Sequence, residues 1–301
     1  MVVHRIEEIE SVDARVRVDI YGGKSIKEVL GDTVWLSYRL GEARFCDDVK
    51  KSKPDIIWYS DDVNKRATYL RDNDLLILHG DWASGELQRL VLCLLVKNLE
   101  RNDHYVFHSS AIHYKGVNIL FMSGEANHGK TMSLIEAARR GAEIISTEGT
   151  IVDISGRVLA GTKDVFLKRR PKGTERADVP PATEGWRKFF DSLPEFKHYT
   201  GEVEGFDLVI LPDIDGHFDT FVAELGQFER EYQTFCCLTT SYYLPWIVIS
   251  PGIPMPLLDD EALRAKRAAF VSDFTKKRPY YLIRGKTPAI ILDEIEKIIK
   301  H

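Results

Sequence analysis

The chain has 301 residues, of which 44% are hydrophobic and 29% are charged, a balance typical of a folded globular protein. Its length suits one large domain or two smaller ones. The net charge of −5 argues against a broad nucleic-acid-binding surface. The first ten residues lack the apolar segment of a secretory signal, and the apolar run 90–96 is too short to cross a bilayer. We therefore expect a cytoplasmic protein that binds neither membranes nor nucleic acid.

Residues 1–103 combine short strand-like runs with one apolar helix, and we expect a small mixed α+β domain. Strands are predicted at 16–21, 34–36, 56–59 and 75–78. Ser84 is a candidate N-cap for a buried helix over 86–100, which is apolar on most sides. The polar residues 101–103 end this helix and mark the predicted boundary with a second domain, 104–301.

The second part of the chain begins with alternating strand and helix patterns. A strand is predicted at 117–122, a helix at 130–140 that ends at Gly141, and another strand from 143. Residues 150–154 and 158–160 indicate a hairpin around Ser155 and Gly156. This order of elements predicts an α/β fold.

Residues 168–205 interrupt that pattern with prolines and a basic cluster, which consists of Lys168, Arg169, Arg170 and Lys172. Such an insertion is either a functional loop or an unstructured one, and its basic cluster is either a binding surface or ordinary solvated charge. A short amphipathic helix is predicted inside it at 186–192. Beyond it we expect strands at 206–212, 246–250 and 280–284, and helices at 260–274 and 289–300.

One motif carries a specific chemistry. Residues 124–131 read GEANHGKT, which matches the phosphate-binding P-loop pattern between a predicted strand and a predicted helix. Backbone N–H groups of such a loop surround a phosphate, and the following helix presents its positive N-terminus to the anion. Lys130 is expected to contact the β and γ phosphates of ATP, and the Thr131 hydroxyl to ligate Mg²⁺. The predicted nucleotide-binding residues are Gly124, Glu125, Ala126, Asn127, His128, Gly129, Lys130, Thr131 and Met132.

This P-loop has two unusual residues. Asn127 stands where many P-loops have glycine, although asparagine tolerates left-handed backbone geometry. Glu125 brings a carboxylate near the phosphates, which is unfavourable unless its side chain points outward. The alternative to a working P-loop is therefore a decayed loop that binds nucleotide poorly.

A second acidic residue should hold Mg²⁺ or act as a base. Glu148, after the strand that follows the P-loop helix, is the first candidate. Asp213 is its rival, because it ends the apolar run 208–212 as a metal-binding aspartate ends its strand in other P-loop proteins. Pro212 makes ordinary strand geometry there less certain.

Residues 106–156 resemble the C-terminal kinase domain of HPr kinase/phosphorylase and of HPr kinase-related proteins, which share the P-loop fold of phosphoenolpyruvate carboxykinase. The resemblance rests on FHSSA at 107–111, on the P-loop, and on RRGAEIISTE at 139–148. It implies an HPr kinase-like P-loop domain over 104–301 with the insertion at 168–205. The first hundred residues carry no such resemblance.

The family implies ATP-dependent phosphorylation of a hydroxyl on a small molecule or a peptide, with ATP and Mg²⁺ as cofactors. It assigns phosphate and metal contacts to Lys130 and Thr131, a place near the transferred phosphate to His108, and metal binding to Glu148. The implied catalytic residues are thus His108, Lys130 and Glu148, and the implied metal ligands Thr131 and Glu148. The resemblance leaves open whether the chain forms a homo-oligomer.

The chain departs from the family at Thr147, where relatives usually have the aspartate that serves as general base. Threonine is a poor proton acceptor at neutral pH. Three explanations are open. Glu148 also serves as the general base, another residue such as His108 or Asp153 has taken that role, or the chain has lost phosphoryl transfer. Two functions follow: an ATP-dependent phosphotransferase, or a catalytically impaired nucleotide-binding module. An ordinary P-loop ATPase is less favoured, because the sequence shows no convincing arginine finger.

Overall fold

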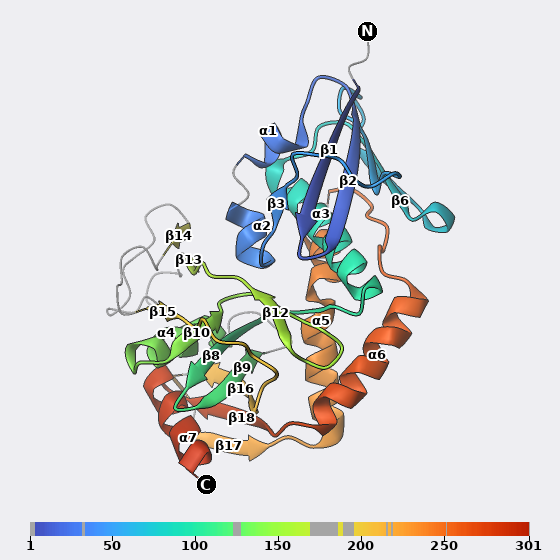
Figure 1. Ribbon diagram of the computed structural model, residues 1–301. Helices are drawn as coiled ribbons and strands as arrows, with labels where there is room; N and C mark the ends of the chain where they lie inside the picture. The colour runs from blue at the N-terminus through green and yellow to red at the C-terminus, as the bar shows by residue number, and fades with distance from the viewer. Residues whose placement is uncertain are drawn as a thin grey trace.

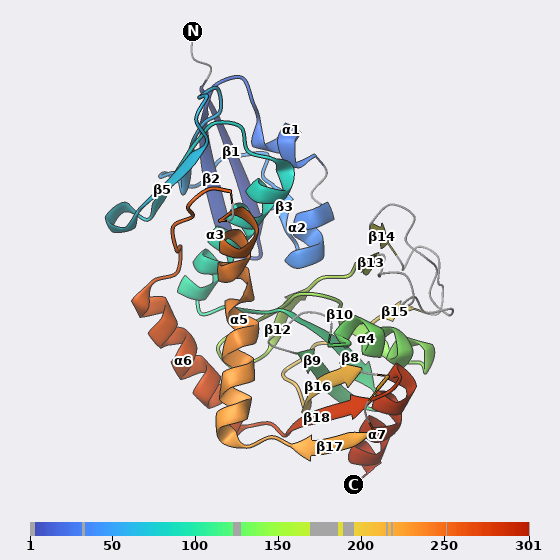
Figure 2. The same ribbon diagram turned by 180° about the vertical axis from the view of Figure 1, so that it is seen from behind.

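The computed structural model describes residues 4–31, 34–122, 128–168, 186–188, 196–214, 216–217, 219–250 and 252–300. Two large sheets and the helices packed on them make up most of these residues, and Figures 1 and 2 show the sheets at opposite ends of the molecule. Both sheets are mixed, with parallel and antiparallel neighbours. The predicted α/β class is therefore confirmed.

The first sheet comes from residues 4–79 and has the strand order β3-β1-β2-β4-β6-β5. Its strands are β1 (His4–Ser11), β2 (Ala14–Tyr21), β3 (Arg44–Phe45), β4 (Ile56–Tyr59), β5 (Arg66–Leu70) and β6 (Leu75–His79). Val16, Val18 and Ile20 alternate along β2 and are fully buried. They belong to one apolar core with helix α3 (Ser84–Arg101). Two short helices, α1 (Ile26–Leu30) and α2 (Val34–Arg39), lie between β2 and β3.

Helix α3 connects the two parts of the molecule. Its buried leucines share their core with Tyr242 and Ile249 of helix α5 (Gln227–Ile249). Figure 1 shows α3 leading from the first sheet toward the upper end of α5. The division at residue 103 stays a prediction, because this core contains residues from both sides of it.

The second sheet has the order β15-β10-β8-β9-β16-β18-β17. Its strands are β8 (Ser109–Tyr114), β9 (Val117–Met122), β10 (Glu143–Ser146), β15 (Lys197–His198), β16 (Leu208–Ile214), β17 (Phe221–Glu224) and β18 (Tyr280–Gly285). Helices α4 (Lys130–Arg139) and α7 (Pro288–Lys300) cover one face, onto which Ile119 and Phe121 point. Helices α5 and α6 (Glu261–Lys276) cover the other, where Leu120 packs.

Two smaller sheets complete the described structure. β7 (Tyr105–Phe107), β11 (Thr150–Val152) and β12 (Val158–Gly161) form one, with β11 in the middle. The β11–β12 hairpin turns at Gly156, whose φ of 93° favours glycine, so the predicted hairpin is confirmed. β13 (Phe166–Lys168) pairs with β14 (Trp186–Lys188).

Several predicted elements are wrong. Residues 34–36 start helix α2 instead of a strand, because helical spacing buries Leu36 and Leu40 on one side. Residues 246–250 continue α5, whose end leaves Trp246 52% and Ile247 62% exposed, unlike a buried strand.

Two smaller corrections concern the first residue of α3 and the secondary structure of the insertion. Residue 83 caps α3, while Ser84 lies inside the helix and accepts a hydrogen bond from Gln88. Residues 186–188 form strand β14 instead of the start of a helix, because pairing with β13 supplies their backbone hydrogen bonds. Residues 189–192 and the basic residues Arg169, Arg170 and Lys172 lie outside the described residues. None of the described helices is long and apolar enough to cross a membrane.

Candidate functional site

The topology brings the predicted site residues to one edge of the second sheet. β9 leads into the P-loop, while β10 leads to Glu148. Both strands pair antiparallel with β8, one on each side, so their carboxyl ends lie at the same edge. His108 comes just before β8 and therefore sits at that edge too. The helix that follows the P-loop, α4, begins at Lys130, as predicted.

The part of the P-loop that the structure describes starts at His128; Gly124, Glu125, Ala126 and Asn127 lie outside the described residues. Gly129 caps α4 with a φ of 107°, a conformation that favours glycine. A Cβ atom at this position would lie 2.6 Å from the side chain of Ile214. Space and backbone geometry thus both require glycine here.

Lys130 is 6% exposed, which is unusual for a lysine. Burial lowers the pKa of Lys130 and outweighs the opposing effect of the nearby Glu148 carboxylate. Thr131 is half-buried on the first turn of α4. Met132 packs its side chain into the core between α4 and the sheet, which leaves its backbone N–H as the group able to contact a phosphate.

His108, Glu148 and Arg39 form a connected cluster. His108 Nε2 lies 2.9 Å from Glu148 Oε1, and Arg39 donates to the same oxygen at 3.0 Å. Burial disfavours ionisation of Glu148, but His108, Arg39 and Lys130 outweigh it and lower its pKa to about 2. Burial and Lys130 lower the pKa of His108. The arrangement is an ionised carboxylate that accepts from a neutral imidazole.

Arg39 is the residue that sequence reasoning missed. It ends α2, far from Glu148 along the chain, and Figure 1 shows α2 on the side of the first sheet that faces β10 and β12. A Cβ at Gly149 would collide with the carbonyl oxygen of Arg39. A Cβ at Gly41 would lie 3.1 Å from the backbone of Gly161. A glycine in the sequence does not show which segment packs against it, so these contacts could be found only in the structure.

Thr147 points away from this cluster. Its hydroxyl donates to the carbonyl of Asp164 at 2.6 Å and lies 3.0 Å from the Thr162 hydroxyl. Asp153 is occupied elsewhere, since its carboxylate accepts from the backbone N–H groups of Ser155 and Arg157 in the β11–β12 turn. The geometry therefore does not bring Asp153 to the site.

Asp213, the rival acidic residue, lies at the same sheet edge near the end of β16. It accepts from Arg284 at 2.6 Å, and His128 Nδ1 is 3.9 Å away. Pro212 fits within β16 because the pairing of β9 with β16 has ended at Ile210. The strand geometry that the proline made uncertain is thus present.

A metal site was expected at Thr131 and Glu148. Among the described residues, no group of three or more His, Cys, Asp or Glu side chains could hold a metal ion. Mg²⁺ in nucleotide sites is commonly bound by one or two carboxylates together with phosphates and water. The Glu148 carboxylate and the Thr131 hydroxyl fit that mode of binding in donor type.

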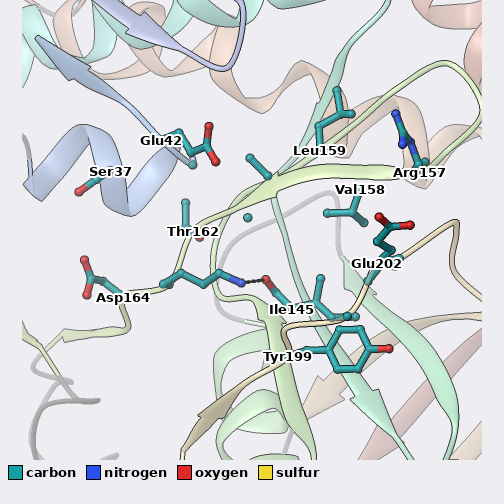
Figure 3. Close-up of a pocket in the computed structure, with 16 residues that line it drawn as sticks. Ser37, Glu42, Ile145, Arg157, Val158, Leu159, Thr162, Asp164, Tyr199 and Glu202 are labelled. Carbon is teal, nitrogen blue, oxygen red and sulfur yellow. Dashed lines mark hydrogen bonds between the residues drawn. The ribbon is translucent and has the colours of Figure 1, made fainter.

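A cavity of about 620 Å³ lies beside the cluster. Thr162, on its wall, accepts hydrogen bonds from the backbone N–H groups of Glu148 and Gly149, both at 2.9 Å. Figure 3 shows Glu42 on one side of the cavity and Tyr199 and Glu202 on the other. Lys163, which also lines the cavity, donates to the Ile145 carbonyl at 2.7 Å. The volume suits a small molecule or a peptide side chain.

No protein-family model matches the chain. No curated protein matches it significantly either.

Proposed function

We propose that this chain is an ATP-dependent phosphotransferase that phosphorylates a hydroxyl of a small molecule or a peptide. In this proposal residues 104–301 form a P-loop domain of the HPr kinase/phosphoenolpyruvate carboxykinase type. The observation that carries it is the charge of the cluster. Among the described residues, Lys130 and Arg39 both lie near the Glu148 carboxylate at the N-terminus of α4. The two cations and the positive end of this helix favour a polyanionic ligand.

The described residues have separable roles in this proposal. The N-terminus of α4 and Lys130 bind the phosphates of ATP. Glu148 and Thr131 would hold Mg²⁺, which neutralises phosphate charge when bound. The hydrogen bond from His108 orients Glu148. Because positioning and electrostatics supply most of the catalysis in phosphoryl transfer, a site without the usual aspartate can still be active.

The hydroxyl proton needs an acceptor other than Thr147. Glu148, with a pKa of about 2, is a weak base. His108 is neutral, and a ring that donates from Nε2 keeps Nδ1 as a proton acceptor. We therefore assign the role to His108. The acceptor hydroxyl attacks the γ phosphorus, ADP leaves, and the proton passes to the imidazole.

The cavity beside Glu148 is the proposed acceptor site. One wall, which includes β12 and Thr162, is joined to the cluster by the hydrogen bond from the Glu148 backbone N–H to the Thr162 hydroxyl. Residues 199–203 of the insertion form the opposite wall. It offers both acidic and basic side chains, among them Glu42, Glu202 and Arg157. Such a lining suits a polar acceptor with several hydrogen-bonding groups.

The alternative function is a nucleotide-binding module without phosphoryl transfer. Thr147 favours it, because the hydroxyl is engaged with Asp164 and Thr162 and replaces the family's base. Phosphorus NMR separates the two functions. The protein is mixed with MgATP and a set of polyols, amino alcohols and serine peptides.

The phosphotransferase predicts loss of the γ-phosphate signal and growth of a phosphomonoester signal, which depend on the acceptor and vanish in Lys130→Met. ATP that binds and stays intact with every acceptor would favour the module. Arg44→Met is a suitable control, because Arg44 is 73% exposed and pairs with Glu10.

A further inference from the structure

The strongest unassigned feature is the arginine that reaches the site from the first sheet's side of the molecule. Arg39 lies at the end of α2, and its side chain is 21% exposed. It shares the Glu148 oxygen with His108, so two donors meet one acceptor atom. A guanidinium has five N–H donors in a planar fork that matches carboxylate and phosphate oxygens.

The charges around Arg39 favour an additional anion. Glu148 is the carboxylate that Arg39 contacts, and Lys130 is close enough to lower the pKa of that carboxylate further. A second arginine, Arg89 of α3, lies near Arg39, and burial and the Arg39 charge lower its pKa. Among the described residues, Arg39 and Lys130 thus both act on the Glu148 carboxylate, and Arg89, which Glu86 partly offsets, adds positive charge beside Arg39.

The backbone fixes the position of Arg39. The carbonyl of Arg39 packs directly against Gly149, the residue after Glu148. Gly41 packs equally closely against Gly161 of β12. The Ser11 hydroxyl also donates to the Gly41 carbonyl at 2.7 Å. The backbone of residues 39–41 is therefore held against Gly149 and β12, so the Arg39 side chain stays within reach of the site when it changes partner.

We propose that Arg39 is a phosphate-contacting residue of the nucleotide site, which leaves Glu148 for the terminal phosphate of ATP when nucleotide binds. This inference rests on the proposed function. It makes α2 part of the nucleotide site, although Arg39 precedes Glu148 by 109 residues along the chain. Because only ATP carries the terminal phosphate, Arg39 should discriminate ATP from ADP.

Calorimetric titration with MgATP and with MgADP tests this directly. Arg39→Ala should weaken ATP binding about tenfold or more and ADP binding less than about threefold. Arg39→Lys should fall between the parent and Arg39→Ala, since it keeps the charge without the fork. Arg44→Ala removes an exposed arginine of β3 and should change neither affinity.

Gly149→Ala provides a second variant that keeps the arginine but displaces it. It should reproduce the selective loss of ATP binding while thermal unfolding shows a folded protein. Equal losses for ATP and ADP in Arg39→Ala, or no loss of either, would overturn the role of Arg39 and leave the proposed function standing. A parent protein that binds neither nucleotide would overturn both.

Discussion

Two buried charge clusters of this protein can be compared. In the first, where α3, α5 and α6 meet, Arg267 donates to Glu100 at 2.8 Å and to Asp259 at 3.1 Å. Tyr242 donates to Glu100, and Lys97, one turn earlier on α3, donates to the Leu258 carbonyl. The cations Arg267 and Lys97 are thus matched by carboxylates in this cluster.

The second cluster, at the edge of the larger sheet, differs in its balance. One carboxylate, Glu148, faces Arg39, Lys130 and the His108 ring. A cluster with matched charges needs no ligand, whereas buried cations that outnumber the described carboxylates would be stabilised by an anion. The comparison therefore favours a structural role for the Arg267 cluster and motivates the proposed binding role of the Glu148 cluster.

The largest expected effect concerns the matched cluster. Arg267→Met leaves Glu100 and Asp259 buried without their cation, and it should lower the free energy of unfolding by about 3–5 kcal/mol. Urea unfolding measures this, with the exposed Arg44→Met as a control expected to change little. A loss below about 1 kcal/mol would remove the distinction between the clusters.

A smaller effect is expected at Thr147. Thr147→Asp replaces a hydroxyl that donates to the Asp164 carbonyl with a carboxylate that cannot, which should cost about 1–3 kcal/mol of stability. We expect no gain in ATP turnover, measured by ADP release. Thr147→Ser keeps the donor and should retain the parent stability. A large gain in turnover would instead show that the site is decayed and lacks only its aspartate.

Gly129→Ala tests whether the P-loop backbone is as constrained as its contacts indicate. An alanine at a φ of 107° is strained and would meet Ile214, so about 1–2 kcal/mol of stability should be lost. ATP affinity should fall as well, because the N-terminus of α4 shifts. Gly116→Ala is a matched control for backbone strain, since its φ is 81° but nothing lies near the added Cβ. Equal ATP affinity in both variants would argue against a rigid loop.

The smallest effect is a pH dependence. The pKa of Glu148 is about 2 in the folded protein, compared with the ordinary value of 4.5 expected in the unfolded chain. The carboxylate thus stabilises the fold above pH 4.5, and this contribution is lost as the pH falls toward 2. Between pH 6 and pH 4 only about 1 kcal/mol of this contribution should be lost, and unfolding curves should show a shallower decline for Glu148→Gln than for the parent. Identical slopes would mean that Glu148 does not titrate with a lowered pKa.

Local patterns allowed much of the second sheet to be predicted. The strand before the P-loop and the helix that starts at Lys130 follow from residues close in sequence. The resemblance assigned His108 and Glu148 to one site, and the structure brings the two side chains within 2.9 Å, while their roles stay a prediction. Predictions at 34–36 and 246–250 were wrong because short runs rich in valine, isoleucine and tryptophan occur in helices when tertiary packing favours it.

Arg39 could not be predicted for a different reason. Its contact with Glu148 joins residues 109 positions apart and depends on glycines at 41, 149 and 161, which let two backbones approach. Asp153 was a candidate base because of its residue type. Its carboxylate instead accepts hydrogen bonds from backbone N–H groups in the turn at 153–157.

The most direct test is calorimetric titration of the purified protein with MgATP, with Lys130→Ala alongside. The cations Lys130 and Arg39 at the N-terminus of α4 predict micromolar binding in the parent and a loss of about a hundredfold or more in the variant. Lys163→Ala, a lysine of the neighbouring cavity, should bind ATP like the parent. No binding in the parent, or equal binding by the parent and Lys130→Ala, would contradict a nucleotide site at this edge of the sheet.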